Sequence, residues 1–212
     1  MKKFAVLSLL FFLASCSSVL INHDHAATDD VSKEKYTSEA KGIVLVTASG
    51  SRAWGCGSYE NAELRSIGFD LEPSTKGKES IPDLVINSTP DGHLNYAFLL
   101  EPGTYGISYI SIKVARSKSD VGYINANRSA LVVGSASKGG SFTVNAGETV
   151  YIGHFALDCA HGPTLWRFYL EDREGFDGYV GEYKAAYPYL DLNDVKYRLF
   201  TTKKFGHDFV LP

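Results

Sequence analysis

Hydrophobic and polar residues alternate along much of the chain, a pattern that predicts short strands with one buried face. The clearest example is residues 66–72, where Ile67, Phe69 and Leu71 fall on one face and polar residues or glycine on the other. Runs of β-forming residues predict the other strands, at 43–47, 83–87, 94–100, 105–114, 141–144, 149–157, 165–171 and 195–201. We therefore expect a mainly β fold, with an antiparallel β-sandwich favoured and a barrel as the alternative.

Turn-forming residues separate these strands. Residues 101–104 (Glu-Pro-Gly-Thr) and 145–148 (Asn-Ala-Gly-Glu) each lie between two predicted strands, and residues 90–92 (Pro-Asp-Gly) predict a further turn. Proline fixes one backbone dihedral and glycine tolerates positive φ, so the first two segments predict tight hairpins. Long loops on a rigid scaffold often carry binding, and we expect such contact loops at 57–66, 73–81 and 116–129.

The C-terminal part of the chain has a different period. Phe176, Val180, Tyr183 and Tyr187 recur at helical spacing, and Pro188 ends the run. Two glycines inside this run each lower helix propensity by about 1 kcal/mol. We therefore expect one short C-terminal helix that forms by packing against a sheet.

The first 16 residues carry an export pattern. Lys2 and Lys3 precede an apolar run that is too short to span a membrane, and Leu13-Ala14-Ser15-Cys16 closes it. This resembles a bacterial lipoprotein signal peptide with its lipobox. The resemblance implies cleavage after residue 15 and a lipid on Cys16 that holds the protein at a membrane; a cysteine that merely ends a secretory signal is the alternative.

The residues that follow Cys16 suggest where the protein is held. No aspartate follows the cysteine directly, which by resemblance to enterobacterial lipoproteins implies the outer membrane, with the protein facing the periplasm. Residues 17–40 are mostly small and polar and predict a flexible tether with an average reach of roughly 25–30 Å. The expected organisation is a signal peptide at 1–15, a lipidated tether at 16–40 and a β-sandwich domain at 41–212.

The cysteine count bears on disulfide bonding, and the net charge bears on the kind of partner. Once Cys16 is lipidated, Cys56 and Cys159 remain, and an even pair in an exported protein predicts a disulfide, with two buried free thiols as the alternative. The formal net charge is −3 and there is no basic stripe, which argues against nucleic acid as a partner.

Two turn-and-strand segments point to a family. Residues 99–105 (Leu-Leu-Glu-Pro-Gly-Thr-Tyr) and 142–153 (Phe-Thr-Val-Asn-Ala-Gly-Glu-Thr-Val-Tyr-Ile-Gly) resemble a loose group of uncharacterised bacterial envelope lipoproteins. These proteins carry one β-sandwich related to the transthyretin-like or carboxypeptidase-regulatory type. The resemblance covers roughly residues 94–157, while 57–93 departs from the compact version, and it implies no activity, cofactor or catalytic residue.

Residue types suited to catalysis are present without a recognised motif. His-Glu-x-x-His, Gly-x-Ser-x-Gly and Cys-x-x-Cys do not occur in the sequence. His154, Asp158, Cys159 and His161 are of metal-binding types, but a cysteine in a disulfide cannot be a thiolate ligand. We therefore expect no metal, no cofactor and no catalytic site, and a hydrolase that uses His154 or His161 is the less favoured alternative.

The tryptophans are the best candidates for ligand contact. Trp54 and Trp166 could stack on a sugar or anchor a protein partner if they are exposed, although packing in the core is the commoner fate of such residues. The leading hypothesis is a lipid-anchored, non-catalytic binding or structural module of the cell envelope. Its partners would be the membrane, through the lipid, and an envelope protein or a glycan.

Overall fold

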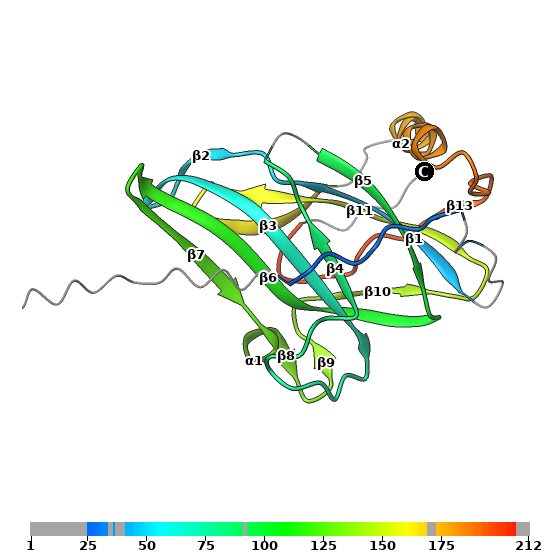
Figure 1. Cartoon of the computed structure of the whole chain (residues 1–212), viewed down its shortest axis with the longest axis horizontal. Helices are drawn as coiled ribbons and strands as arrows, with labels where there is room; N and C mark the ends of the chain where they lie inside the picture. Colours follow the sequence, from blue (N-terminus) through cyan, green and yellow to red (C-terminus); the bar gives the residue numbers. More distant parts are fainter. Residues whose placement is uncertain (1–24, 34–35, 37–40, 91–92, 169–172, 207–212) are drawn as a thin grey trace, which may run out of the picture.

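The computed structural model describes residues 25–33, 36, 41–90, 93–168 and 173–206 (Figure 1). Within these ranges the chain is mainly β, with a six-stranded, a five-stranded and a two-stranded sheet and the helices α1 (Arg128–Leu131) and α2 (Arg173–Ala186). The expected signal peptide (1–15) and Cys16 lie outside the described residues. None of the described helices is long and apolar enough to cross a bilayer.

The six-stranded sheet has the order β10-β6-β3-β2, with β4 paired to β3 and β7 paired to β6. Its strands pair antiparallel throughout. They are β2 (Ala53–Cys56), β3 (Tyr59–Glu72), β4 (Leu84–Asn87), β6 (Gly103–Ser117), β7 (Asp120–Ala126) and β10 (Ser141–Val144). The two-stranded sheet pairs β8 (Val132–Val133) with β9 (Ala136–Ser137).

The five-stranded sheet has the order β12-β11-β1-β5, with β13 also paired to β11. Its strands are β1 (Gly42–Ser49), β5 (His93–Leu100), β11 (Thr149–Asp158), β12 (Thr164–Phe168) and β13 (Val195–Tyr197). β1 is antiparallel to β5 but parallel to β11, and β13 is also parallel to β11. The expectation of purely antiparallel pairing is therefore wrong for this sheet.

Side chains from both large sheets meet in one hydrophobic cluster. Val44 of β1, Phe69 of β3 and Phe155 of β11 are fully buried in it. The ring of Phe69 lies 5.5 Å from that of Phe142 and 6.1 Å from that of Phe155, in edge-to-face contacts that favour a fixed packing. The strand predicted for 66–72 is present, and its apolar residues face the cluster as expected. The prediction of a single buried face is wrong, however, because Ser66, Gly68 and Asp70 on the opposite face are also buried.

The two predicted hairpin turns are not hairpins. Residues 101–102 connect β5 of the five-stranded sheet to β6 of the six-stranded sheet, and residues 145–148 connect β10 back to β11. Each turn therefore carries the chain from one sheet to the other. The backbone conformation of the second turn was nevertheless predicted correctly, since Gly147 has a positive φ of 68°. A turn motif does not specify which strand its neighbours pair with, however, and pairing in the opposite sheet buries both apolar faces.

Two of the three predicted loops are strands. β3 begins at Tyr59, so most of 57–66 is extended, and 116–129 contains the end of β6, all of β7 and the start of α1. These stretches look like loops in the sequence because they carry many polar residues. The loop at 73–81 is confirmed.

Some predicted boundaries shift or lie outside the described residues. The last strand ends at Tyr197 rather than at 201, although Thr201 makes an isolated bridge with Ser141 of the other sheet. The turn residues 91–92 and the end of the strand predicted at 165–171 fall outside the described ranges.

Helix α2 confirms the predicted C-terminal helix. Its buried residues Phe176 and Tyr183 pack with Leu45 of β1 and Tyr151 of β11, on the side of the five-stranded sheet that faces away from the main cluster. Figure 1 shows α2 beside β5 and β13. The four-residue helix α1 is an addition that the sequence pattern did not predict.

Residues 25–33, here called the N-terminal strap, lie along the edges of both large sheets (dark blue in Figure 1). Thr28 N donates to the carbonyl of Val85 in β4 at 2.9 Å, and Val31 N donates to the carbonyl of Ala97 in β5 at 2.8 Å. Asp30 Oδ1 accepts from Ala97 N at 2.8 Å. The tether expected at 16–40 is therefore wrong for these residues, and the folded domain starts before residue 41.

Candidate functional site

The predicted disulfide is present. Cys56 at the end of β2 is bonded to Cys159, which follows β11, across a sequence separation of 103 residues. The bond joins the edge of the six-stranded sheet to the central part of the five-stranded sheet. Its role is therefore structural, and Cys159 is not free to bind a metal.

The candidate metal or hydrolase residues do not assemble. His154 Nδ1 lies 3.3 Å from the hydroxyl of Tyr179 under helix α2, whereas His161 is exposed in the loop after β11. Among the described residues, no three side chains of the metal-binding types His, Cys, Asp and Glu come together. The geometry thus gives no support to the hydrolase alternative.

The two tryptophans have different environments. Trp54 on β2 is 63% exposed, with the guanidinium of Arg52 5.6 Å from its ring centroid. Trp166 on β12 is partly buried and packs against the main hydrophobic cluster. The two residues belong to different sheets and do not form one exposed strip, so only Trp54 remains a candidate for ligand contact.

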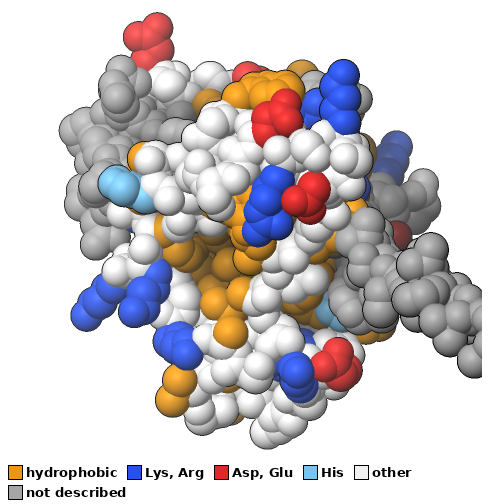
Figure 2. All heavy atoms as spheres, turned by 90° about the vertical axis from the view of Figure 1, so that its left-hand side faces the viewer, with side chains coloured by type: hydrophobic (Ala, Val, Ile, Leu, Met, Phe, Trp, Pro, Cys, Tyr) orange, Lys and Arg blue, Asp and Glu red, His pale blue; other side chains and the backbone are white. Residues whose placement is uncertain are grey.

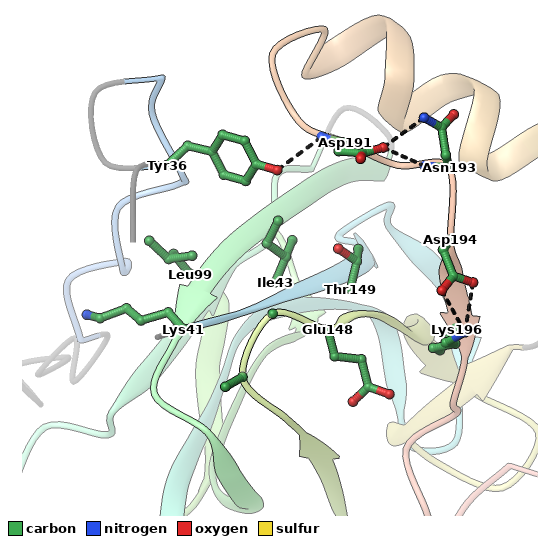
Figure 3. A pocket seen from close by; sticks show the side chains of 12 residues that line it. Tyr36, Lys41, Ile43, Leu99, Glu148, Thr149, Asp191, Asn193, Asp194 and Lys196 are labelled. Carbon is green, nitrogen blue, oxygen red and sulfur yellow. Dashed lines mark hydrogen bonds and ion pairs between the residues drawn. The ribbon is translucent and has the colours of Figure 1, made fainter. Parts of the chain in front are cut away.

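A cavity of about 780 Å³ lies beside the start of β1 and β11 (Figure 3). Its volume falls in the range of roughly 300–1,000 Å³ that is typical of small-molecule sites. Four separate parts of the chain supply its lining: Tyr36, Lys41, Ile43, Leu99, Ala146, Gly147, Glu148, Thr149, Asp191, Asn193, Asp194 and Lys196. Sequence reasoning missed these residues because no local motif connects segments so far apart.

The cavity has an apolar floor and a charged rim. Ile43 and Leu99 belong to adjacent strands, β1 and β5, and are directly paired there, while Thr149 begins β11 (Figure 3). On the rim, Lys196 Nζ lies 2.7 Å from Asp194, and Lys41 Nζ lies 2.9 Å from Glu101. Most rim charges are thus already paired.

Glu148 and Asp191 differ in their partners. Arg198 donates to both carboxylate oxygens of Glu148 at 2.6 Å. Although burial alone would raise the pKa of Glu148, the hydrogen bonds from Arg198 and Asn145 hold it below its ordinary value. Asp191 accepts hydrogen bonds from the backbone and side-chain nitrogens of Asn193, so among the described residues its hydrogen-bond donors are neutral. Within the part of the chain that the structure describes, the carboxylate of Asp191 is therefore not paired with a cation.

A second hollow lies at the end of the molecule that carries β2 and the β6–β7 connection. Figure 2 shows this end, with hydrophobic side chains in a central recess and Lys and Arg side chains around it. A hollow of about 150 Å³ beside the β6–β7 connection is lined by Tyr59, Val114, Arg116, Asp120, Gly122, Tyr123 and Ile124. This volume is below the usual size of a ligand site, so the larger cavity is the better candidate.

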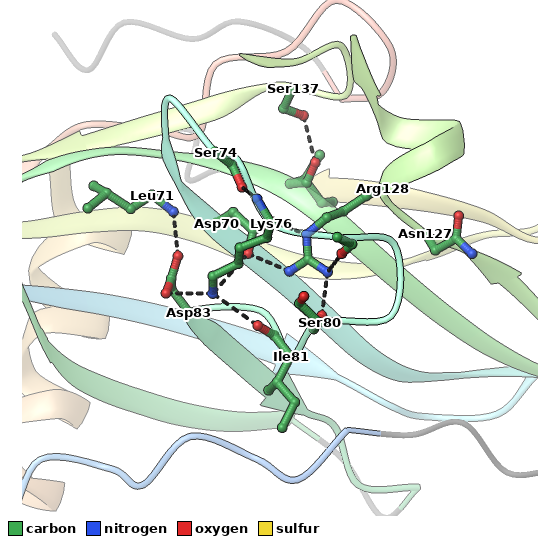
Figure 4. A network of polar contacts seen from close by, with 12 residues as sticks. Asp70, Leu71, Ser74, Lys76, Ser80, Ile81, Asp83, Asn127, Arg128 and Ser137 are labelled. Carbon is green, nitrogen blue, oxygen red and sulfur yellow. Dashed lines mark hydrogen bonds and ion pairs between the residues drawn. The ribbon is translucent and has the colours of Figure 1, made fainter. Parts of the chain in front are cut away.

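The predicted contact loop at 73–81 is held against the six-stranded sheet by a polar network (Figure 4). Arg128 of α1 donates to both oxygens of Asp70 on β3, and also to the carbonyls of Gly77 and Ser80 in the loop. Lys76 Nζ donates to Asp83 at 2.6 Å. The network fixes the loop in place, so this loop is a rigid part of the surface.

Comparison with known proteins adds no assignment. No protein-family model matches the chain, and neither a curated protein nor a solved structure matches it.

Proposed function

We propose that this protein is a lipid-anchored module of the bacterial cell envelope that binds a small amphipathic ligand without catalysis. The observation that carries the binding role is the cavity of about 780 Å³, with its apolar floor and charged rim. The N-terminal sequence pattern supports the anchor: a signal peptide at 1–15, a lipid on Cys16 and placement at the outer membrane facing the periplasm.

We also propose that the two large sheets form a β-sandwich. The shared hydrophobic cluster between them and the two connections that cross from sheet to sheet support this arrangement. The resemblance to the transthyretin-like or carboxypeptidase-regulatory type stays a prediction.

The strap supports a positioning role for the anchor. The strap forms hydrogen bonds to both large sheets. A pull from the lipid anchor on the N-terminus would therefore be distributed over both sheets. Cys16 precedes His25 by nine residues, which span at most about 30 Å when fully extended. The anchor thus keeps the domain close to the membrane surface.

The cavity favours a ligand with an apolar part and a positive charge. Ile43 and Leu99 provide apolar surface, and the carboxylate of Asp191 lacks a paired cation among the described residues. An amine near Asp191 would gain a charge-assisted hydrogen bond, which is about twice as strong as a neutral one. Both a small molecule with an amine and the amino terminus of an envelope protein have this chemistry.

The test of the cavity is a titration of the full-length protein, purified in detergent, with butylamine, butanol and butyrate. We expect butylamine to shift the NMR signals of the Ile43 and Leu99 methyl groups more than the other two probes. Ala146→Trp, in the cavity lining, should abolish these shifts, whereas Ala130→Trp, at an exposed position of α1, should not. Equal shifts in both variants would refute the cavity as the site.

The anchor has a separate test. Mass spectrometry of the protein from envelope fractions should find a mature N-terminus at Cys16 that carries diacylglycerol and an acyl chain. Cys16→Ser should lose this modification and accumulate as the uncleaved precursor. An unmodified Cys16 in a soluble mature protein would rule out the anchor.

Exposure of Trp54 favours one second candidate, a glycan-binding surface. Aromatic side chains at 63% exposure are available for stacking on a sugar ring. In a pull-down with envelope glycans, Trp54→Ala should then lose binding while the protein keeps its stability. Retention of the Trp54→Ala protein on the glycan would refute this candidate.

A further inference from the structure

Three basic side chains gather on the outward face of the six-stranded sheet, around one carboxylate. Glu63 on β3 and Lys113 on β6 are paired across the strands, while their neighbours Leu64 and Ile112 point into the hydrophobic cluster. Glu63 therefore points away from the cluster. Its oxygens lie 2.7 Å from Arg52 Nε and 3.7 Å from Lys113 Nζ. Arg65, at an irregularity in the pairing of β3, has its Nη1 4.0 Å from the same carboxylate.

The charge that reaches solvent here is positive. Glu63 is only 2% exposed, whereas the side chains of Arg52, Arg65 and Lys113 are 47%, 29% and 34% exposed. Three cations share one buried carboxylate, which leaves a local excess of two positive charges on a chain whose formal net charge is −3. We call Arg52, Arg65 and Lys113 the basic face.

The basic face also has unused hydrogen-bond donors. Arg65 Nε is buried and has no hydrogen-bond partner among the described residues, and 4.0 Å is too long for a hydrogen bond from its Nη1. The hydroxyls of Ser66 and Ser111, paired across the strands beside it, are likewise buried without a partner in the described part of the chain. Buried donors are normally satisfied, so these three are exceptions, and they lie beside the charged groups of the basic face.

The strap enters the domain on the same face. His25 stacks edge-on against Tyr109 at a centroid distance of 4.7 Å, and its carbonyl accepts a hydrogen bond from Asn87. Tyr109 is paired with Gly68 and Asn87 with Ser66, which places both on the outward face of the six-stranded sheet. If Cys16 carries a lipid, as the proposed function requires, then His25, nine residues after it, lies on this face of the domain.

We infer that the basic face docks on the anionic phospholipid headgroups of the membrane that holds the lipid anchor. Charge complementarity selects this partner, because phosphate oxygens are strong acceptors for guanidinium and ammonium groups. Each basic side chain contributes roughly fivefold to binding at an anionic surface. Binding of this strength is weak for a free protein. A short tether to the membrane raises the effective concentration of the domain at the surface to about millimolar, so the same interaction is enough to orient an anchored domain. The exposed ring of Trp54, beside Arg52, suits the membrane interface.

The test measures how fast lysines react with a water-soluble amine reagent when the lipidated mature protein is in vesicles. Vesicles of phosphatidylcholine alone are compared with vesicles that also contain phosphatidylglycerol at a ratio of about seven to three. Mass spectrometry follows Lys113 and, in the same molecule, Lys184 on α2, which packs on the other sheet. We expect Lys113 to react several-fold more slowly in the anionic vesicles, with recovery at high salt, and Lys184 to react equally in both.

Variants separate docking from general charge effects. Arg65→Gln should restore most of the Lys113 reactivity in anionic vesicles, whereas Lys203→Gln, an equal charge change at another exposed position, should not. Lys113 protection that survives Arg65→Gln, or equal Lys113 reactivity in both vesicle types, would overturn the docking surface. Protection by inorganic phosphate in neutral vesicles would show a free-phosphate site instead. The same spectra report whether Cys16 is lipidated, so failure of the anchor is distinguished from failure of the docking.

Discussion

Replacing Arg128 tests how much its buried contacts on the outward face of the six-stranded sheet contribute to the stability of the protein. Arg128 is 7% exposed and donates to Asp70, which is 1% exposed, and to two carbonyls of the 73–81 loop. Arg128→Met keeps an unbranched side chain that replaces the aliphatic part of arginine, but it removes all of these donors. The Asp70 carboxylate is then left buried, with Lys76 Nζ at 3.5 Å as its cation partner.

The size of the effect follows from these contacts. Removing one partner of a buried ion pair costs about 3–5 kcal/mol, and the remaining lysine places this case near the lower end, at about 3 kcal/mol. With a urea dependence of about 2.5 kcal/mol per molar, the unfolding midpoint should fall by roughly 1.2 M. Arg116→Met is the matched control, because Arg116 and its partner Asp120 are both 57% exposed, and it should change stability by less than about 0.5 kcal/mol.

Urea unfolding, followed by circular dichroism, measures both variants. The double variant Asp70→Leu with Arg128→Met should be more stable than Arg128→Met alone, because no carboxylate then stays buried without its main partner. A midpoint for Arg128→Met within 0.2 M of the unmodified protein would refute the reasoning. So would a double variant that is less stable than the single one.

Three further predictions concern the disulfide, the strap and a buried tyrosine. Replacing Cys56 and Cys159 with alanine should lower the free energy of unfolding by up to about 4–5 kcal/mol, since the bond closes a loop of about a hundred residues; an unchanged urea midpoint would contradict this. Burial raises the pKa of Asp30 in spite of hydrogen bonds from Tyr187 and Ala97, so its contribution to folding is fully present at low pH and is lost as the pH rises through that pKa. After correction for intrinsic rates, amide exchange of Val31 should therefore be slower at pH 3, below the ordinary carboxyl pKa, than at pH 7, and Asp30→Asn should remove the difference. Burial raises the pKa of Tyr105 to about 12, so stability should fall between pH 10 and 12 as the unfolded state ionises. Tyr105→Phe should make the pH dependence of the urea midpoint less steep in that range, and an identical slope would argue against the shift.

Local patterns predicted the elements whose signal lies within a few residues. The alternation of Ile67, Phe69 and Leu71 marked the residues of β3 that face the hydrophobic cluster, because side chains on one face of a strand repeat every two residues. The spacing of Phe176 and Tyr183 marked α2, whose buried residues both fall on that series. Counting cysteines was enough to pair Cys56 with Cys159 once Cys16 was set aside.

The candidate sites were much less predictable. Ile43, Leu99 and Asp191 line the cavity together, yet they come from distant parts of the chain and no spacing connects them. Glu63 and Lys113 are ordinary polar residues in the sequence and become neighbours only when β3 pairs with β6. Trp54 and Trp166 looked equivalent, and only packing separates the exposed ring from the partly buried one.

The sequence by itself determined where the long helix and the strands with a strong apolar pattern form, because backbone preference and the period of burial are local properties. It did not determine the polar strand β7, which has no such pattern. The tertiary structure decided which strands pair. It set β1 parallel to β11, turned the two expected hairpins into connections between sheets, and fixed the strap to the edges of β4 and β5. The physical reason is that pairing depends on burying apolar faces and satisfying backbone hydrogen bonds across the whole chain, and no short segment carries that information.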